Sequence, residues 1–128
     1  MPAPVEIRAS RAERTLTVTF DDGARFVLPA EYLRVESPSA EVQGHSPDQK
    51  VLVWGRRHVG ILKVEPVGNY AVRIVFDDLH DTGIYSWDYL HQLGREYETR
   101  WARYLDELAA RGLSREPRKV VKAKDAER

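Results

Sequence analysis

Two similar stretches, each with a strand, an acidic turn, a second strand and a helix start, constrain the fold of this chain most strongly. The first is FDDGARFVLPAEYL, residues 20–33, and the second is FDDLHDTGIYSWDYL, residues 76–90. Because Asp-Gly favours a tight hairpin turn, Asp22-Gly23 predicts an antiparallel hairpin in the first stretch. The likeness between the stretches has two explanations, an internal duplication or a chance similarity between hairpins with acidic turns.

The rest of the pattern predicts more hairpins and a C-terminal helical segment. Residues 5–10 alternate apolar and polar side chains, and residues 59–78 form two apolar runs around a turn at Pro66 to Asn69. From Ser86, the expected N-cap of a helix, apolar residues recur every three or four positions: Leu90, Leu93, Tyr97, Trp101, Tyr104 and Leu108. Gly94 predicts a bend or break between two helices, and Gly112 a left-handed helix end. We therefore expect an α+β fold, with antiparallel hairpins forming a small sheet or sandwich against this helical segment.

Composition limits the domain organisation and the classes of partner. The 128 residues fit a single domain, which we place at residues 1–113, followed by a basic, disordered tail at residues 114–128. A formal net charge of zero argues against nucleic acid as the main partner. No apolar run is long enough to span a membrane, and the chain contains no cysteine. We expect a cytoplasmic protein without a membrane partner.

Two segments outside the regular pattern are candidates for function. Residues 35–49 are rich in Ser, Pro, Gly and Gln, which predicts a loop of unusual length for a compact domain. Trp54 stands beside Arg56 and Arg57 in a segment bounded by glycines. Since Trp and Arg are enriched at protein interfaces, these three residues form a candidate interaction surface. The alternative is an edge strand protected by its charges.

His80, between acidic residues in the second turn, is the candidate for chemistry. As a metal ligand it could join His45 and a nearby carboxylate, Asp78 or Asp81, around a divalent metal such as iron or zinc. As a structural residue it would hydrogen-bond a carbonyl or an aspartate and fix the turn. No serine-nucleophile elbow or phosphate-binding glycine loop is present, so no catalytic motif supports an enzyme.

The stretches LRVESPSAEVQGH and VGILKVEPVGNYAVRIVFDDLHDTGIYSWDYL resemble small bacterial proteins of the gamma-butyrobetaine hydroxylase-like N-terminal domain family. The resemblance covers roughly residues 5–117, and it implies a compact fold of strands with helical elements. In eukaryotic oxygenases this domain precedes a separate iron- and 2-oxoglutarate-dependent domain, which we do not expect in this protein. Similar domains are attached to P-loop ATPases that carry iron–sulfur clusters. The stand-alone bacterial members have no established activity to transfer.

The same resemblance implies which residues occupy a family zinc site. In the oxygenases three cysteines and one histidine hold a structural zinc, the cysteines in a pattern like LRDxCxCxxC. Here Ser37, Ser39 and Val42 stand at the cysteine positions, and His80 matches the histidine. With three of four ligands replaced, a tetrahedral zinc site is not expected. His80 is then expected to fasten its turn, bonding to the loop at Ser37 to Ser39.

Three functional hypotheses follow from the sequence. The first is a non-catalytic accessory module that binds another protein, in a setting of iron–sulfur or metal-cofactor metabolism that the resemblance implies, without a cofactor of its own. The second is a metal-binding protein that uses His45, His80 and a nearby aspartate. The third is an enzyme with a small-molecule pocket under the loop at residues 35–49.

Overall fold

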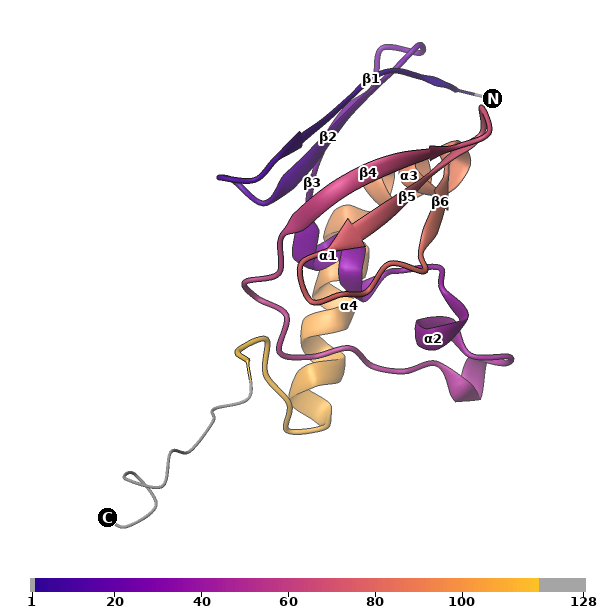
Figure 1. The fold of residues 1–128 in the computed structure, drawn as a ribbon. Helices are drawn as coiled ribbons and strands as arrows, with labels where there is room; N and C mark the ends of the chain where they lie inside the picture. The colour runs from indigo at the N-terminus through magenta and orange to yellow at the C-terminus, as the bar shows by residue number, and fades with distance from the viewer. Residues whose placement is uncertain (1, 118–128) are drawn as a thin grey trace.

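The computed structural model describes residues 2–117 and shows two small antiparallel sheets packed with helices (Figure 1). The first sheet contains β1 (Pro4–Ser10), β2 (Thr15–Phe20) and β3 (Arg25–Pro29), in that order. The second contains β4 (Ile61–Val67), β5 (Ala71–Phe76) and β6 (Ile84–Ser86), again in chain order. The predicted α+β class and its antiparallel hairpins are confirmed.

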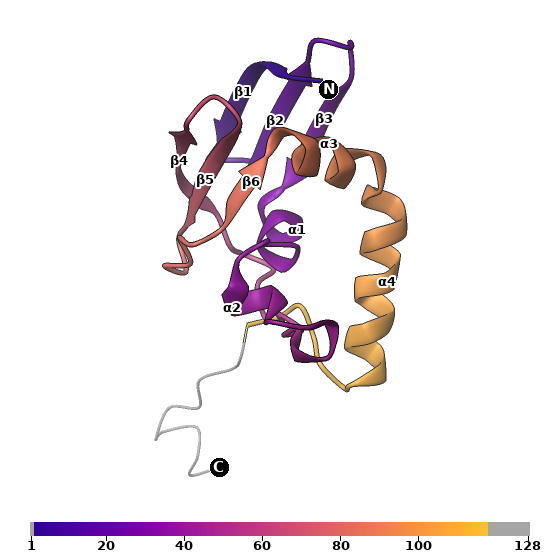
Figure 2. The same ribbon diagram turned by 90° about the vertical axis from the view of Figure 1, so that its right-hand side faces the viewer.

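The helices complete the fold at one end of the sheets. They are α1 (Ala30–Val35), α2 (Ala40–Gln43), a 3₁₀ turn (Pro47–Gln49), α3 (Trp87–Arg95) and α4 (Tyr97–Ala110). Figure 2 shows α3 beside the sheets and α4 running away from them, across from α1 and α2. No helix within residues 2–117 has the length and apolar character needed to cross a membrane.

The main core lies between the two sheets and helices α1 and α3. In β2 the predicted alternation buries Leu16, Val18 and Phe20, which are at most 1% exposed. Helix α1 is buried on every side, including its charged residues Glu31 and Arg34. Because a buried charge needs a partner, the position of α1 determines where ion pairs must form.

The C-terminal helical segment follows the predicted stripe. Leu90, Leu93, Tyr104 and Leu108 are buried, and the hydroxyl of Ser86 caps α3 by accepting a hydrogen bond from the N–H of Tyr89. Gly112, with φ +66°, ends α4: the N–H of Leu113 bonds the carbonyl of Leu108, as in a Schellman motif.

Gly94 has a different role from the one predicted. The break between α3 and α4 falls at Glu96, and Gly94 lies inside α3. A Cβ atom at Gly94 would lie 2.3 Å from the Phe26 ring. Glycine is therefore required because β3 and α3 approach closely here, and not because the helix bends.

Backbone hydrogen bonds show that the two acidic turns are equivalent. The N–H of Phe20 bonds the carbonyl of Ala24 at 2.8 Å, and the N–H of Phe76 bonds the carbonyl of His80 at 2.9 Å. In each turn an aspartate side chain, Asp22 or Asp78, accepts the N–H two residues later. The third turn residue has positive φ in both cases, +88° at Gly23 and +72° at Leu79.

The helices that follow these turns contact each other in the same reciprocal way. Tyr32, the third residue of α1, donates its hydroxyl to the carbonyl of Leu93, the seventh residue of α3. Tyr89, the third residue of α3, donates to the carbonyl of Glu36, seven positions into the α1 segment. Such matched contacts favour an internal duplication over chance similarity as the origin of the two stretches.

One predicted loop is wrong, and one residue of the predicted tail contacts the fold. Residues 35–49 are not one long loop, because Ser39 caps α2 and the carbonyl of Val42 accepts the N–H of Val51 at 2.7 Å. Arg115, which we expected in a disordered tail, forms two hydrogen bonds to the buried carboxylate of Glu31, at 2.7 and 2.9 Å. Residues 114–117 thus belong to the described structure, and the rest of the predicted tail lies outside the described residues.

Trp54 does not lie in an edge strand, because residues 51–60 form neither strand nor helix. This segment is attached to the fold at scattered points. The hydroxyl of Tyr104 donates to the carbonyl of Val53, and the N–H of Gly55 bonds the carbonyl of Ser114. Residues 51–60 thus cross the fold as an irregular extended segment.

Candidate functional site

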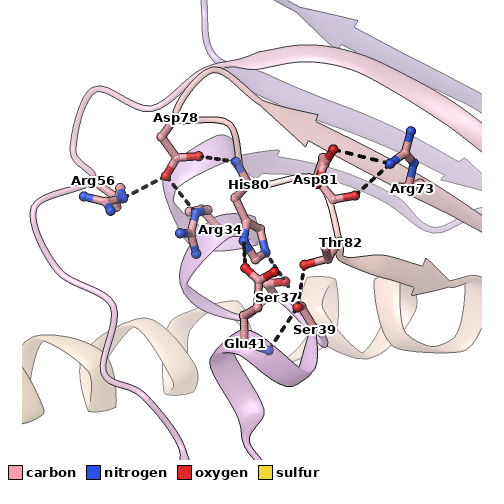
Figure 3. A network of polar contacts seen from close by, with 10 residues as sticks. All are labelled: Arg34, Ser37, Ser39, Glu41, Arg56, Arg73, Asp78, His80, Asp81 and Thr82. Atoms are coloured by element: carbon pink, nitrogen blue, oxygen red, sulfur yellow. Dashed lines mark hydrogen bonds and ion pairs between the residues drawn. The ribbon is translucent and has the colours of Figure 1, made fainter.

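The second acidic turn places Asp78 at the centre of a polar network (Figure 3). The Nε of Arg34 donates to Oδ2 of Asp78 at 2.8 Å, and the N–H of His80 donates to Oδ1 at 3.1 Å. The Nε of Arg56 also lies 2.8 Å from Oδ2, but its N–H is not directed at it, so this contact is an ion pair without a hydrogen bond. Burial raises the pKa of Asp78, but the His80 N–H and the two arginines outweigh it, and the pKa is lowered overall.

His80 joins this turn to the segment that precedes α2. Its Nε2 lies 2.9 Å from Oγ of Ser37, and its Nδ1 lies 3.3 Å from Oε2 of Glu41. A carboxylate only accepts, so we assign the ring hydrogen to Nδ1, and the Ser37 hydroxyl then donates to Nε2. Nearby, the hydroxyls of Ser39 and Thr82 are 2.6 Å apart. The hydrogen bond expected between His80 and the Ser37 loop is present.

His80 is expected to remain neutral at pH 7. Burial lowers its pKa below the ordinary 6.5, the charge of Arg34 lowers it further, and Glu41 and Asp78 oppose this only in part. As the pH is lowered, His80 is therefore protonated at a higher pH in the unfolded chain than in the folded protein. The stability that His80 contributes is thus present above pH 6.5 and is lost as the pH falls through the lower pKa of the folded state. A ¹H–¹⁵N titration of the imidazole should show titration below pH 6.5 from the Nδ1–H tautomer. A midpoint at or above 6.5 would contradict this assignment.

A cleft of about 420 Å³ opens beside the network. It is lined by residues 51–56 together with Arg34, Glu41, Val42 and His80. Arg34 is only 8% exposed, and its Nη1 is buried without a hydrogen-bond partner among residues 2–117. The cleft thus combines an apolar wall, contributed by Val42 and residues 51–54, with a guanidinium group that is not fully satisfied.

The predicted interaction surface is divided by the structure. Trp54, which is 36% exposed, and Arg56 line the cleft. Arg57 does not line it and pairs with Glu116 instead. The described contacts therefore place Trp54 and Arg56, but not Arg57, at the candidate site.

The structure does not bring together the residues that the sequence analysis considered as ligands of a metal ion. His45 is exposed and does not line the cleft, while Asp81 faces Arg73. Asp78 contacts His80 through the backbone N–H and not through the ring. Within residues 2–117 no three His, Cys, Asp or Glu side chains are grouped so that they could hold a metal ion.

The zinc that the family resemblance implies does not fit these residues either. Ser37 and Ser39 replace two cysteines and are used in hydrogen bonds, and Val42 is an apolar side chain 2% exposed. Both ring nitrogens of His80 already face protein atoms. The hydrogen bonds from Ser37 to His80 and from Ser39 to Thr82 join the two segments that carry the family's zinc positions.

The distances from Ser37 to His80 and from His80 to Glu41 match those of a hydrolase triad. Ser37, however, is 0% exposed and does not line the cleft. A Cβ atom at Gly83 would lie 2.7 Å from its hydroxyl, so the backbone of Gly83 covers it closely. Because no substrate carbonyl can reach the hydroxyl, the arrangement does not support nucleophilic catalysis.

Sequence reasoning missed Arg34, Glu41 and Leu79. Arg34 and Glu41 lie far from the turn in sequence, and no local pattern indicates that they meet it. Leu79 has positive φ and is 82% exposed, which is unusual for leucine. Aligning the two acidic turns would have identified it, because Leu79 occupies the position of Gly23.

Comparison with known proteins agrees with the fold. Two proteins with NMR solution structures are 48% and 46% identical, with TM-scores of 0.80 and 0.79. They are matched over 94% and 95% of this chain, and over 95% and 92% of their own. A crystal structure of a protein with unknown function from Acidithiobacillus ferrooxidans, belonging to the DUF971 family, is 40% identical, with a TM-score of 0.60, over 71% of this chain and 91% of its own.

No curated protein matches the chain. The sequence model described as gamma-butyrobetaine hydroxylase-like, N-terminal, matches residues 7–91, a span that includes both acidic turns and the whole His80 network. The match covers more than half of the chain, and it agrees with the resemblance found in the sequence. The chain therefore belongs to the gamma-butyrobetaine hydroxylase-like, N-terminal family.

Proposed function

We propose that this protein is a non-catalytic accessory module that binds a partner protein at the cleft and at the turn beside it. Leu79 is the observation that carries the proposal. A left-handed backbone costs a leucine about 1 kcal/mol or more, and burial does not offset this cost because the side chain is 82% exposed. The equivalent turn has glycine at this position, so the fold itself does not require leucine.

Other exposed apolar side chains line the cleft to which His80 of this turn also contributes. Val51 is 51% exposed and Trp54 36% exposed, and both line the cleft next to Arg56 and His80. Exposed apolar groups beside arginine are typical of protein interfaces. The proposal includes a setting in iron–sulfur or metal-cofactor metabolism, on the basis of the family resemblance. It also includes a cytoplasmic location, on the basis of the absence of cysteine.

Photo-crosslinking in cells of the source organism tests the proposal. A benzophenone amino acid placed at position 79, or at position 54, should crosslink the same single protein. Val27 and Leu105 are matched controls, since both are exposed apolar residues, on β3 and on α4. Crosslinking at these two positions should not yield that protein.

The identified protein is then titrated against purified wild type and Leu79→Gly. Loss of an exposed leucine anchor should weaken binding at least about tenfold. The variant should be as stable as the wild type or slightly more stable, because glycine relieves the strained backbone. Equal affinity of the two proteins, or equal crosslinking at all four positions, would refute the proposal.

A further inference from the structure

The guanidinium group of Arg34 is unusual because it is buried and only partly satisfied. Its Nε donates to Asp78, while Nη1 has no hydrogen-bond partner among the residues that the structure describes. Buried polar groups are nearly always paired, and Arg34 is one of the residues that line the cleft, so its unsatisfied guanidinium group is the natural partner of a ligand group there. The group that best satisfies a guanidinium is a planar anion.

Charge at this point also favours an anion. Arg34 and Arg56 share one carboxylate oxygen of Asp78, so two positive charges face one negative charge at this point, and the second carboxylate of the lining, Glu41, contacts His80 instead. The other oxygen of Asp78 is occupied by the N–H of His80. Asp78 therefore holds the two arginines in place without neutralising both.

The surroundings of the two arginines restrict the kind of anion. Val42 and residues 51–54 form an apolar wall beside them, which suits an apolar group attached to the anion. Glu41 stands at the edge with its carboxylate 3.3 Å from His80, and its charge opposes a doubly charged anion such as phosphate more than a single carboxylate. His80 is neutral and adds no positive charge.

Building on the proposed function, we infer that the cleft recognises a carboxylate of the partner protein together with an adjacent apolar side chain. The carboxylate bonds Arg34 and Arg56, and the apolar side chain packs against Trp54 and its neighbours in the cleft. A C-terminal carboxylate and an acidic side chain share this chemistry.

NMR titration with small probes tests the inference on the full chain. N-acetyl-leucine carries a terminal carboxylate, acetyl-Glu-Leu-amide carries only a side-chain carboxylate, and N-acetyl-leucinamide carries none. The signals to follow are the Nε–H groups of Arg34 and Arg56 and the indole N–H of Trp54. One of the two carboxylate probes should shift all three signals until they saturate. Its dissociation constant should be at least about tenfold lower than that of the amide probe. The tighter of the two identifies the source of the carboxylate.

Two neighbouring arginines provide matched variants. Arg56→Ala should weaken binding of the tighter probe at least about fivefold, whereas Arg57→Ala, which removes an arginine outside the cleft, should leave it unchanged within about twofold. Inorganic phosphate should bind more weakly than the tighter carboxylate probe. Equal binding of phosphate, or equal effects of the two variants, would overturn the inference.

The outcomes separate this inference from the proposed function. If the crosslinks identify a partner but no carboxylate probe binds the cleft, the partner-binding function stands and the carboxylate inference fails. If a probe binds as described but positions 54 and 79 yield no common partner, the carboxylate site stands and its assignment to a partner protein fails.

Discussion

Replacing Asp78 by alanine is expected to lower the free energy of unfolding by about 3 kcal/mol, as when one partner of a buried ion pair is removed. The substitution would leave Arg34, which is 8% exposed, without its partner carboxylate. It would also remove the acceptor for the N–H of His80 and release Arg56. Urea denaturation of wild type and variant measures the loss directly.

Asp22 supplies a matched control for Asp78, because it occupies the equivalent position in the first acidic turn. Its side chain is 40% exposed and pairs with His91, so Asp22→Ala should destabilise the protein clearly less. Because the pKa of Asp78 is lowered in the folded protein, its contribution is present above its ordinary pKa of 3.8 and is lost as the pH falls through the lower value. Equal losses in the two variants would show that Asp78 is no more important than an ordinary turn residue.

His80→Ala is expected to lower the free energy of unfolding by about 1–3 kcal/mol, because buried partners lose their hydrogen bonds. Ser37→Ala should cost a similar amount, since its hydroxyl is 0% exposed and contacts Nε2 of His80. If the two side chains stabilise the fold through the hydrogen bond between them, the double variant should lose about 1 kcal/mol less stability than the sum of the losses in the two single variants.

His45→Ala is the histidine control for this cycle. His45 is exposed, and its described hydrogen bond uses the backbone N–H, which donates to Gln49. Removing its ring should change stability little. Strictly additive effects of His80→Ala and Ser37→Ala would contradict the hydrogen-bonded link, and so would a large loss in His45→Ala.

Local patterns in the sequence predicted the parts of the fold that depend on neighbouring residues. Alternation along residues 14–28 identified strands, because side chains on one face of a strand lie two residues apart, and the apolar runs within residues 59–78 identified a second hairpin. The stripe from Leu90 to Leu108 identified helices for the equivalent reason. The caps at Ser86 and Gly112 were also found, since each depends on residues within one turn.

The parts that were missed depend on contacts between distant residues. Residues 35–49 contain α2 because Ser39 caps it and Val42 pairs with Val51, and neither contact is visible in a sequence rich in Ser, Pro and Gly. Arg115 is ordered because it pairs with Glu31 in a helix buried on all sides, 84 residues earlier. For the same reason Arg34, 44 residues from Asp78, was not recognised as part of the site.

The contact of His80 with Ser37 was expected because of the family resemblance and not because of any spacing in the chain. The cysteine positions of the family identified the residues that must lie near this histidine. The groups that face the ring of His80, a serine hydroxyl at one nitrogen and the carboxylate of Glu41 at the other, could be identified only from the structure.

The contacts of His80 with Ser37 and Glu41 link the second acidic turn to the segment that begins α2. We propose that this link forms without a metal ion. The most direct test is a thermal melt of untagged wild-type protein with and without a strong chelator. Hydrogen bonds alone predict the same melting temperature in both conditions. A fall of several degrees on adding chelator, on the order of the 5 °C that corresponds to about 1 kcal/mol in a domain of this size, would show that a metal ion stabilises the fold and would contradict this account.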